Sequence, residues 1–535
     1  MTKPIKIIDL FAGPGGLGEG FSAYKENASN PFKIAISIEK ETSAHRTLTL
    51  RAFYRQFGDD TPEEYYQFLR GELGKNPEDQ LYKIERFAKQ VSAAQKEARC
   101  FTLGEHNKEI DVAIAEAIGS DECMLIGGPP CQAYSLVGRA RNLGIKDYKA
   151  EDDPRNFLYL EYLKVIAKYQ PLVFVMENVK GLLSAKINGE SIFDNMRKDL
   201  HNPCKATNTV VQKGRSRHNY RIVSLVCPSP ENGVKAGHDE VTAAKNYIIK
   251  TEDFGIPQRR HRVILLGLRE DIADKWDNSL ILSPTATQTS TQDVLNDLPK
   301  LRSGLSKGIN NDESWVETLK NSKAKLSKTL QDSGLESIAQ HIVTTIDKLN
   351  VPKQKQGNNF GVKKTKGLSI KNNIALENWY KDTKLGDYVV NHETRGHIEK
   401  DLHRYMFCST WALVAKKNKW GNPFPKSKDY PNLLKPNHEN FSSGKFADRF
   451  RVQLSHTPAT TVTSHISKDG HYYIHYDPSQ CRSFTVREAA RIQTFPDNYF
   501  FVGNRTQQYV QVGNAVPPFL ANKIADIVYT YIYKL

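Results

Sequence analysis

The sequence has few cysteines, and they form no metal-binding or disulfide pattern. Seven cysteines are scattered over 535 residues, an odd number, and no two of them make a C-x-x-C pair. This distribution argues against a disulfide framework and against a structural zinc site. We therefore expect a reducing compartment and predict no metal ion.

Long apolar runs are also missing. Even the longest clean runs, such as residues 263–266, are short, whereas a membrane-spanning helix needs about 20 apolar residues. The N-terminus, MTKPIKIIDLF, enters a strand-like run at once and has neither the apolar core nor the cleavage site of a signal peptide. A cytoplasmic protein without a membrane anchor is expected.

Acidic side chains are outnumbered by basic ones. The chain has 60 Asp and Glu against 75 Lys and Arg, a formal net charge of +15 at pH 7, and a pI near 9.2. Such an excess favours a polyanionic partner such as nucleic acid. Many basic proteins bind no nucleic acid, so charge alone leaves a nucleic-acid partner and an ordinary charged surface as equal alternatives.

Short β-branched runs recur through the first half of the chain. Helix-like stretches, such as residues 157–169, lie between several of them. This alternation predicts a doubly wound α/β sheet. The runs are residues 5–10, 34–38, 124–126, 172–176, 221–226 and 262–268.

The chain is too long for one ordinary core, so at least two domains are expected. Residues 1–268 plus 482–535 are predicted as one domain, in which the charged, helix-favouring stretch 51–99 is a helical insertion. The long polar stretches of residues 269–481 predict a second, smaller domain. It contains a lysine-rich segment, residues 351–380, with six Lys and one Glu, which on its own is more often a solvated loop than a binding surface.

A glycine-rich turn follows the first predicted strand. Residues 9–18, DLFAGPGGLG, lead from a strand into a helix, where missing side chains let the backbone approach a ligand. The second strand ends at Glu39, whose carboxylate can accept hydrogen bonds from both hydroxyls of a ribose. The order here, G-P-G-G-L-G, follows an Asp-Leu-Phe-Ala lead, and with this lead S-adenosylmethionine fits better than NAD. Taken singly, such a turn sometimes binds nothing, and a strand-end Glu is usually a surface residue.

A second sharp turn follows the strand at residues 124–126. Gly127-Gly128-Pro129-Pro130 gives a rigid bend that places Cys131 at the carboxyl edge of the sheet, where α/β sheets bind ligands. A lone cysteine is usually a structural residue. A thiol presented just past a strand in a Pro-Pro turn, however, resembles a nucleophile.

Six motifs, in order, resemble those of the cytosine-C5 DNA methyltransferase family. The resemblance covers both ends of the chain and leaves the middle region and the 51–99 insertion unmatched. It implies a Rossmann-like, S-adenosylmethionine-dependent methyltransferase sheet, double-stranded DNA as substrate, and target recognition by residues 269–481. The motifs are DLFAGPGG at residues 9–16, GPPCQ at 128–132, Glu177-Asn178-Val179, Gln258-Arg259-Arg260-His261-Arg262, RSFTVREAARIQTFPD at 482–497 and QVGNAVP at 511–517.

The chemistry of cytosine explains why these residue types are needed. C5 is a poor nucleophile until a thiolate adds at C6, and at an ordinary pKa of about 8.5 roughly a tenth of a thiol is ionised near pH 7.5. Nearby positive charge from Arg260 and Arg262 would favour the Cys131 thiolate. By resemblance, Glu177 contacts N3 and the exocyclic amine, Arg262 holds the ring carbonyl, and Arg260 orients Glu177 or a phosphate.

The resemblance also implies the cofactor site. Phe11 stacks near the adenine, Glu39 binds the ribose, and Gly13 and Gly16 belong to the glycine turn. Where the family often has an Asp near the adenine amine, this chain has Leu103-Gly104-Glu105, so Glu105 is assigned as the substitute, at a place where the insertion disturbs the alignment. The remaining pocket residues implied are Leu158, Asn514 and Val516.

A cytosine stacked in a duplex cannot present C6 to a thiol, so an enzyme of this kind must flip the nucleotide out of the helix. Residues 137–153, VGRARNLGIKDYKAEDD, follow the predicted nucleophile directly and suit a loop that closes over DNA. An ordinary surface loop is the alternative.

Histidines are frequent in the predicted recognition domain. Without cysteine or tight metal-ligand spacing, packing or DNA contact is favoured over metal binding. The histidines are residues 392, 397, 403, 456, 465, 471 and 475.

Two other functions are compatible with parts of the pattern. A related branch methylates cytosine in transfer RNA with a similar Pro-Pro-Cys motif, but the long stretch between Arg262 and Arg482 suits DNA target recognition. A catalytically inactive DNA-binding regulator would share the fold, yet every residue that the chemistry needs is present. Enzymes that methylate amino groups carry an acidic or Ser/Asn Pro-Pro-aromatic motif, which Gly-Pro-Pro-Cys contradicts.

The family resemblance implies a biological setting. It is bacterial or phage restriction-modification, in the bacterial cytoplasm or nucleoid. The enzyme is expected to act as a monomer, and a cognate restriction endonuclease, if there is one, would act separately.

Overall fold

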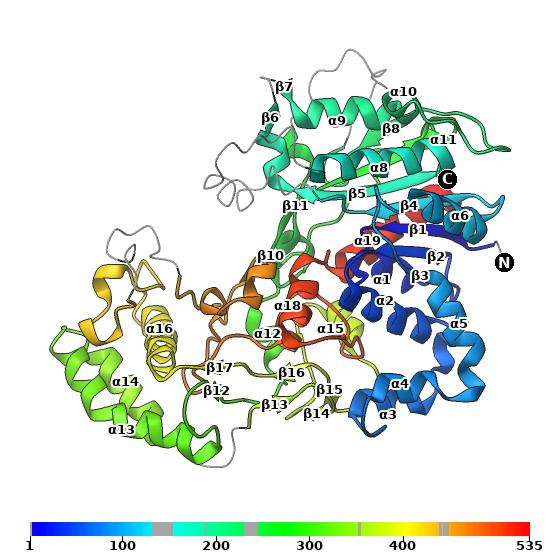
Figure 1. The fold of residues 1–535 in the computed structure, drawn as a ribbon. Helices are drawn as coiled ribbons and strands as arrows, with labels where there is room; N and C mark the ends of the chain where they lie inside the picture. The colour runs from blue at the N-terminus through cyan, green and yellow to red at the C-terminus, as the bar shows by residue number, and fades with distance from the viewer. Residues whose placement is uncertain are drawn as a thin grey trace. The chain divides into compact units, whose positions relative to one another are not determined.

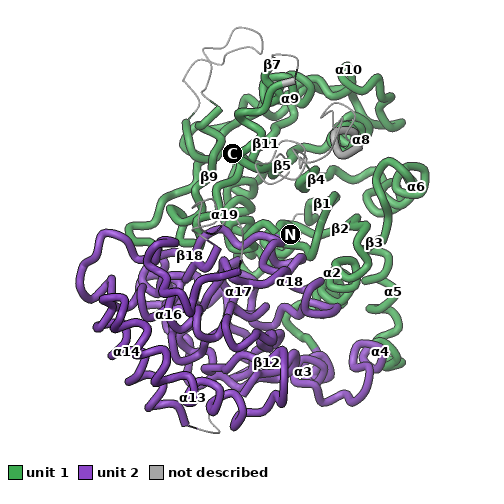
Figure 2. Tube along the Cα trace, turned by 60° about the vertical axis from the view of Figure 1, so that its left-hand side comes forward, with its two compact units in different colours: residues 1–61, 82–288, 514–535 green, residues 62–81, 289–513 purple. Residues whose placement is uncertain are grey.

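The protein consists of two compact units, green and purple in Figure 2. Unit 1 comprises residues 1–61, 82–288 and 514–535, and unit 2 comprises residues 62–81 and 289–513. The computed structural model describes residues 3–130, 154–187, 190–228, 244–350, 355–437, 441 and 449–534. Within these residues, no helix has the length and apolar character needed to cross a membrane.

Unit 1 is built on a mixed eight-stranded sheet. Seven strands lie in the order β3-β2-β1-β4-β5-β11-β8, and β9 pairs with β11. The first five strands of this order are mutually parallel, and β11 runs antiparallel to β5, β8 and β9. The strands are β1 (Ile5–Leu10), β2 (Phe32–Glu39), β3 (Ala98–Cys100), β4 (Cys123–Gly127), β5 (Val173–Val179), β8 (Tyr220–Val223), β9 (Ile248–Lys250) and β11 (His261–Arg269).

The predicted α/β fold is confirmed, and the six predicted runs fall on β1, β2, β4, β5, β8 and β11. Strands such as β4, CMLIG, are buried along their whole length, as parallel strands covered on both faces must be. The sequence did not predict β3 and β9, which have three residues each. Such short segments become strands because they pair with β2 and β11.

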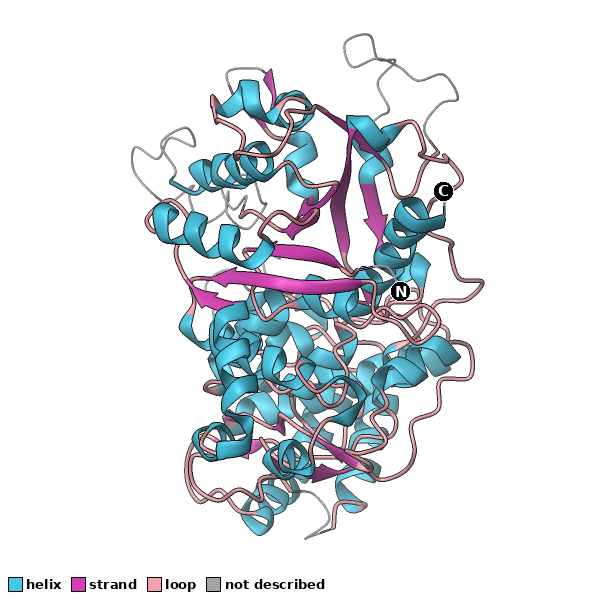
Figure 3. Ribbon diagram, turned by 90° about the vertical axis from the view of Figure 1, so that its right-hand side faces the viewer, coloured by secondary structure: helices cyan, strands magenta, loops and turns pink. Residues whose placement is uncertain are grey.

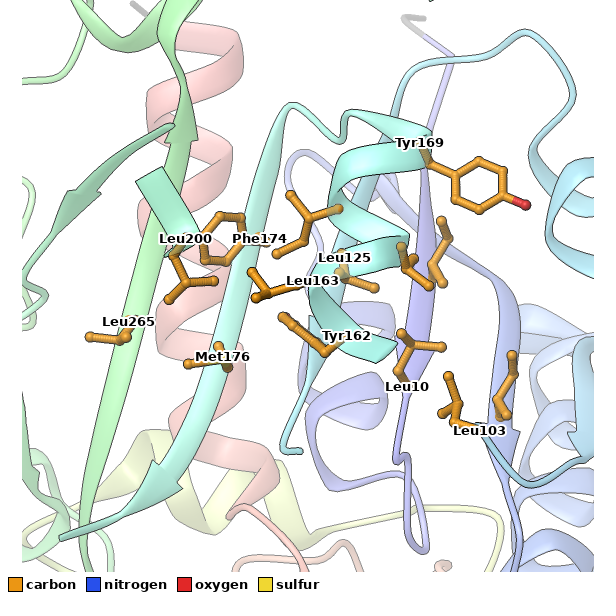
Figure 4. Close-up of a cluster of buried hydrophobic side chains, with 14 of the residues drawn as sticks. Leu10, Leu103, Leu125, Tyr162, Leu163, Tyr169, Phe174, Met176, Leu200 and Leu265 are labelled. Carbon is orange, nitrogen blue, oxygen red and sulfur yellow. The ribbon is translucent and has the colours of Figure 1, made fainter. Parts of the chain in front are cut away.

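Helices cover both faces of this sheet (Figures 1 and 3). One face packs against α6 (Asn107–Ile118), α8 (Pro154–Tyr169) and α9 (Ile192–His201), with Leu10, Leu125 and Met176 in their shared apolar core (Figure 4). In α6 the buried Ile110, Ile114 and Ile118 recur at a helical spacing. Helices of the other face are α1 (Gly16–Ser22), α2 (Thr42–Arg55), α5 (Ala88–Glu97) and α19 (Pro518–Tyr529).

Unit 2 is mainly helical, and the strands described in it have only two residues each. Three of its helices, α13 (Asp312–Gln331), α14 (Glu336–Asp347) and α16 (Glu399–Lys417), enclose a second apolar core that includes Trp315 and Ile342. Its other α-helices are α3 (Glu63–Arg70), most of α4 (Pro77–Tyr82), α12 (Thr291–Leu295), α15 (Ile374–Tyr380), α17 (Val486–Ile492) and α18 (Arg505–Asn514), whose last residue belongs to unit 1.

The compact units differ from the predicted domain bounds in three segments. Residues 482–513 and 62–81 belong to unit 2, and residues 269–288 belong to unit 1. Within unit 2, Arg491 of α17 forms buried ion pairs with Asp297 and Asp497. Residues 62–81, part of the helical stretch 51–99, join the same unit, where Phe68 packs edge-on against Phe500 at 5.1 Å. Ion pairs and ring contacts of this kind decide which core a segment joins. The order of the motifs along the chain does not reveal these contacts.

Candidate active site

Parallel strands bring the predicted site residues to one edge of the unit 1 sheet. The register places Leu10 of β1 beside Ile38 of β2 and Gly127 of β4, and Gly127 is itself beside Met176 of β5. Ligands of open α/β sheets bind outside such carboxyl ends, where the strand order reverses, here between β1 and β4. The residues that follow these four in the chain are Phe11, Glu39, Gly128 and Glu177.

The turn after β1 is shaped by left-handed backbone. Phe11, Gly13 and Gly15 have φ angles of 55°, 56° and 91°, and a non-glycine residue such as Phe11 rarely adopts this conformation. The amide of Ala12 donates to the carbonyl of Ile38 at 3.1 Å, which ties the turn to β2. Around Gly13, the position that a Cβ would occupy has no other described atom within 4 Å. The backbone here is therefore open to a ligand.

Glu39 closes this turn from the end of β2. One carboxylate oxygen accepts the amide of Gly13 at 2.8 Å, and the other accepts the amide of Glu41 at 2.8 Å. Burial raises the pKa of Glu39, and the hydrogen bonds from backbone amides partly offset this rise. A partly buried acidic group at a strand end beside a glycine turn suits the hydroxyls of a ribose. These residues fit the adenosine part of S-adenosylmethionine.

The C-terminal segment packs against the glycine turn at backbone distance. A Cβ on Gly16 would lie 2.2 Å from the carbonyl oxygen of Val516. The side-chain amide of Asn522 donates to the carbonyl of Gly20 at 2.9 Å, so α1 and α19 can approach this closely only because α1 has glycine there. Val516 is buried and Asn514 is exposed. The structure thus brings the last motif beside the first.

The other two predicted cofactor residues differ in their surroundings. Leu158 of α8 is partly buried and packs against the apolar core of the sheet. Glu105 is exposed, and its backbone amide donates to the carbonyl of Thr102 at 3.2 Å. The assignment of Glu105 therefore rests on the family resemblance alone.

Glu177 and Arg262 form an ion pair at the same sheet edge. Arg262 Nε lies 2.8 Å from Glu177 Oε1, and the two side chains are only 15% and 13% exposed. In the antiparallel pairing of β5 and β11, Arg262 is opposite Val179 and Glu177 is opposite Ile264. The two side chains are therefore diagonal neighbours on one face of the sheet. The motif spacing did not predict this pair.

The segment that leads to the predicted nucleophile packs directly on Glu177 and Asn178. A Cβ on Gly128 would lie 3.1 Å from Glu177 Oε2, and the side-chain amide of Asn178 donates to the carbonyl of Pro129 at 3.4 Å. Cys131 itself lies outside the described residues, as does the predicted closing loop, residues 137–153. The ion pair of Glu177 is thus held beside the residues that immediately precede Cys131.

Arg260 is buried behind this edge. Its side chain is 2% exposed, and its backbone amide donates to the hydroxyl of Thr251 at 3.0 Å. The same hydroxyl donates to the carbonyl of Gln258 at 2.6 Å. These bonds fix the backbone at the start of β11, and so fix the position of Arg262.

The structure adds Asp9, a residue that the sequence showed only as the first letter of a motif. Both carboxyl oxygens are buried and have no hydrogen-bond partner among the described residues. Burial raises the pKa of Asp9 to about 8, against an opposing effect of Arg55. Asp9 is therefore mostly protonated at neutral pH. Sequence pattern predicts a buried position here, since the strand is apolar, but carries no signal of a missing partner.

In unit 2, several of the predicted histidines are packed in the interior. His392 and His475 are buried, and burial lowers the pKa of each to about 4. The hydroxyl of Tyr405 is hydrogen-bonded to Nδ1 of the buried His471 at 2.6 Å. Within the described parts of the chain, no group of three or more His, Cys, Asp or Glu side chains is arranged to hold a metal ion.

Comparison with known proteins covers nearly the whole chain. The sequence profile of the family described as "C-5 cytosine-specific DNA methylase" matches residues 84–203 and 244–529. The protein named "Type II methyltransferase M.Bpa9945I", from Bacillus paralicheniformis, is 31% identical over 98% of both chains. "Type II methyltransferase M.DdeI" from Desulfomicrobium norvegicum is 25% identical over 98% of this chain and 89% of its own.

A third relative is named for the reaction itself. "DNA (cytosine-5-)-methyltransferase M.ApeKI" from Aeropyrum pernix is 22% identical over 76% of this chain and 81% of its own. Enzymes of the family take their methyl group from S-adenosylmethionine, and the predicted family and cofactor are confirmed. The chain belongs to the C-5 cytosine-specific DNA methylase family and is an S-adenosylmethionine-dependent DNA cytosine-5 methyltransferase.

Proposed function

We propose that this enzyme methylates one cytosine of a specific duplex DNA sequence, flipped out of the helix, through a covalent adduct with Cys131. The observation that carries the proposal is the Glu177–Arg262 ion pair, with 2.8 Å between Nε and Oε1. It lies at the sheet edge beside Gly128, three positions before Cys131. A base placed at this edge would meet an acid, a guanidinium group and a thiol together.

The chain's own groups would carry the proton and electron movements. The Cys131 thiolate forms a bond to C6, and the ring electrons move through C5 and C4 onto N3, where Glu177 supplies a proton. The product is an enamine that is nucleophilic at C5. When bound, S-adenosylmethionine supplies the electrophilic methyl group. A water molecule then takes the C5 proton, the C5–C6 double bond re-forms as the C6–S bond breaks and its electron pair returns to sulfur, and the N3 proton returns to Glu177.

Arg262 is suited to position both Glu177 and the base. Its Nε lies 2.8 Å from a Glu177 carboxylate oxygen but forms no hydrogen bond within the described residues, and Nη1 donates to the carbonyl of His261 at 3.0 Å. These contacts hold the guanidinium plane, and Nη2 is left to donate to the ring carbonyl of cytosine. Arg260 would act through the backbone that carries Arg262, or on a DNA phosphate.

The cofactor would lie along the first two strand ends. Phe11 would face the adenine, Glu39 would accept the ribose hydroxyls, and Gly13 and Gly16 would let the backbone approach. The open space beside Gly13 and the partly buried Glu39 carboxyl support this arrangement. The remaining proposed contacts are Leu158, Asn514, Val516 and Glu105.

We propose restriction-modification as the biological setting. Two relatives are named type II methyltransferases and match this chain over 98% of its length. Residues 269–481 would select the DNA sequence, the enzyme would act as a monomer in the bacterial cytoplasm, and methylation would protect DNA from a separate endonuclease.

The nucleophile can be tested by Cys131→Ser. We expect methyl transfer from labelled cofactor to duplex DNA to disappear, while calorimetry still detects cofactor binding. A duplex with 5-fluorocytosine at the target should trap a covalent complex with the wild-type enzyme and none with the variant, because fluorine does not leave as a proton does. Turnover by the variant, or no adduct with the wild type, would contradict the mechanism.

The substrate can be tested separately from the mechanism. Genomic DNA from cells that express the enzyme would be treated with bisulfite and sequenced. We expect 5-methylcytosine at one position of one recurring sequence. Methylation without a recurring sequence would contradict target selection, and methylation of transfer RNA in place of DNA would contradict the proposed substrate.

A further inference from the structure

Unit 2 contains a cavity of about 530 Å³ that is separate from the residues of the proposed catalytic site. All of its lining residues belong to unit 2 and to the described part of the chain. They come from α12 and the residues after it, from Lys366, from α16, and from the segments around residues 452–456 and 475–488. This volume lies within the range of about 300 to 1,000 Å³ that is usual for small-ligand sites.

The floor of the cavity has no unbalanced charge. Arg482 and Glu488 are buried and form a bidentate ion pair, with N–O distances of 2.6 and 2.7 Å. His475 is buried beside them, and burial lowers its pKa to about 4, so it is neutral at physiological pH. Its Nδ1 accepts the backbone amide of Asp477 at 3.0 Å. The floor therefore needs no ligand to satisfy its charges.

The rim, by contrast, has surplus positive charge. Lys300 is paired with Asp477 at 2.7 Å. Lys366 and Lys416 are exposed, line the cavity, and form no ion pair with any residue in the described segments. Burial and the nearby Lys416 lower the pKa of His456, a further rim residue. Two unpaired ammonium groups at the mouth suit an anion such as a phosphate.

One wall is apolar and aromatic. Leu298 and Leu454 line the cavity together with Tyr476, whose ring is stacked on that of His475 with 4.4 Å between centroids. The side-chain amides of Asn296 and Gln480 also line it. Aromatic rings stack with any nucleobase, and amides can bond to the edge of a base. The lining thus combines the chemistry of a base site with that of a phosphate site.

A second hollow of about 400 Å³ adjoins the cavity and shares Lys300, Asp477 and Pro478 with it. It adds Lys348 to the positive residues of this surface. A ligand whose phosphate reaches the rim can therefore continue into a second basic hollow, as a nucleotide within a strand would.

We propose that this cavity binds a nucleoside monophosphate, with the base on the wall of Leu298, Leu454 and Tyr476 and the phosphate at Lys366 and Lys416. The nucleotide can be free or can be an unpaired nucleotide of a DNA strand, since both present the same chemistry. This binding site is additional to the proposed catalytic function and does not depend on it.

The test uses the full-length enzyme saturated with S-adenosylhomocysteine, so that the cofactor site is occupied. Calorimetry measures binding of dGMP, deoxyguanosine and inorganic phosphate, and fluorescence anisotropy measures binding of a labelled single-stranded oligonucleotide. The first variant combines Lys366→Glu and Lys416→Glu. The second, Leu413→Trp, narrows the cavity without changing charge at a position that is 47% exposed. The matched control combines Lys320→Glu and Lys325→Glu, exposed positions on α13.

We expect the double lysine variant to weaken dGMP binding at least about tenfold, Leu413→Trp to weaken it as well, and the control to bind as the wild type does. If dGMP displaces the oligonucleotide and binds more weakly than it, the ligand is a nucleotide of a strand; tighter dGMP binding identifies the free nucleotide. The proposal is overturned if the wild type does not bind dGMP. It is also overturned if inorganic phosphate binds as tightly as dGMP and Leu413→Trp does not weaken that binding. Methylation of duplex DNA by each variant, measured in parallel, reports on the catalytic function independently.

Discussion

Two buried ionisable groups, Arg491 in unit 2 and Asp9 in unit 1, are accommodated in opposite ways. In unit 2, Arg491 is fully buried between Asp297 and Asp497, and all three are paired. In unit 1, Asp9 is equally buried, yet its carboxyl has no hydrogen-bond partner among the described residues. A buried charge without a partner is costly, and the group neutralises instead. Unit 2 therefore keeps its buried charges, while unit 1 keeps a protonated acid beneath the glycine turn.

This difference predicts at which of the two sites a charge stabilises the fold and at which it would weaken it. Removing one member of a complete buried network leaves uncompensated charges. Removing an unpartnered acid removes only the cost of its burial. Unit 1 also contains paired charges, among them the buried Arg51–Glu19 pair and the Glu177–Arg262 pair at the sheet edge.

The largest effect is expected from Arg491→Met. The change leaves Asp297 buried without its cation and Asp497 with only the longer 3.6 Å pair to Lys364, and should lower the free energy of unfolding by about 3 to 5 kcal/mol. Denaturant titration measures this, and hydrogen exchange of unit 2 peptides locates it. Adding Asp297→Asn and Asp497→Asn should recover part of the loss. Lys320→Met, on the exposed face of α13, is the control. If Arg491→Met lowers the free energy of unfolding no more than this control does, the buried ion pairs of Arg491 do not stabilise unit 2.

The next largest effect is expected from Glu177→Gln. The amide keeps the size of the side chain but cannot supply a proton to N3, so single-turnover methylation should slow by about a thousandfold. The thermal midpoint and cofactor affinity should stay near those of the wild type. The exposed Glu270→Gln serves as the matched control. Slow methylation accompanied by an equally lowered thermal midpoint would indicate a structural role instead.

A smaller effect, dependent on pH, is expected from Asp9→Asn. The pKa of Asp9 is raised from 3.8 in the unfolded chain to about 8 by burial. Between these values the native state holds a proton that the unfolded state has lost, so stability falls as pH rises from about 4 to about 8. The variant should lose less stability than the wild type over this window in thermal unfolding. The control is Asp60→Asn, at an exposed site of unit 1, which should show the same change of stability with pH as the wild type. If Asp9→Asn also shows the same change with pH as the wild type, Asp9 does not cause the pH dependence.

The smallest effect at neutral pH is expected in unit 2. Burial lowers the pKa of His392 and His475 from 6.5 to about 4. Between these values the unfolded state binds protons that the native state excludes, so stability is lost as pH falls from about 6.5 to about 4. Hydrogen exchange at pH 5 and pH 7 should show unit 2 peptides less protected at the lower pH. If unit 1 peptides lose more protection from hydrogen exchange than unit 2 peptides between pH 7 and pH 5, the predicted difference between the units is wrong.

Much of unit 1 can be predicted from sequence because its signals are local. Continuous apolar runs mark β4 and β5, and the glycine turn marks the boundary between β1 and α1. The three-residue strand β3 carries no such signal, since only pairing with β2 makes it a strand. The compact units differ from the predicted domains for a similar reason, because residues 482–513 carry a family motif yet pack into unit 2.

The site was predicted as a set of residues and not as a set of contacts. Glu177 and Arg262 were both expected near the base, but the antiparallel register of β5 and β11 is what makes them a pair. The sequence showed Asp9 only as part of a motif. The sequence of β1 does not reveal whether a buried carboxyl has a hydrogen-bond partner.

The sequence by itself determined the family, the reaction and the residue types of the site, because a glycine turn, a Pro-Pro-Cys turn and a strand-end acid each need particular side chains in a short stretch of chain. Only the tertiary structure decided that Arg262 meets Glu177, that Val516 touches Gly16, and that the Asp9 carboxyl has no hydrogen-bond partner among the described residues. The physical reason is that a short motif sets local backbone and chemistry. Distances and desolvation depend on strand register and on the packing of segments far apart in the chain.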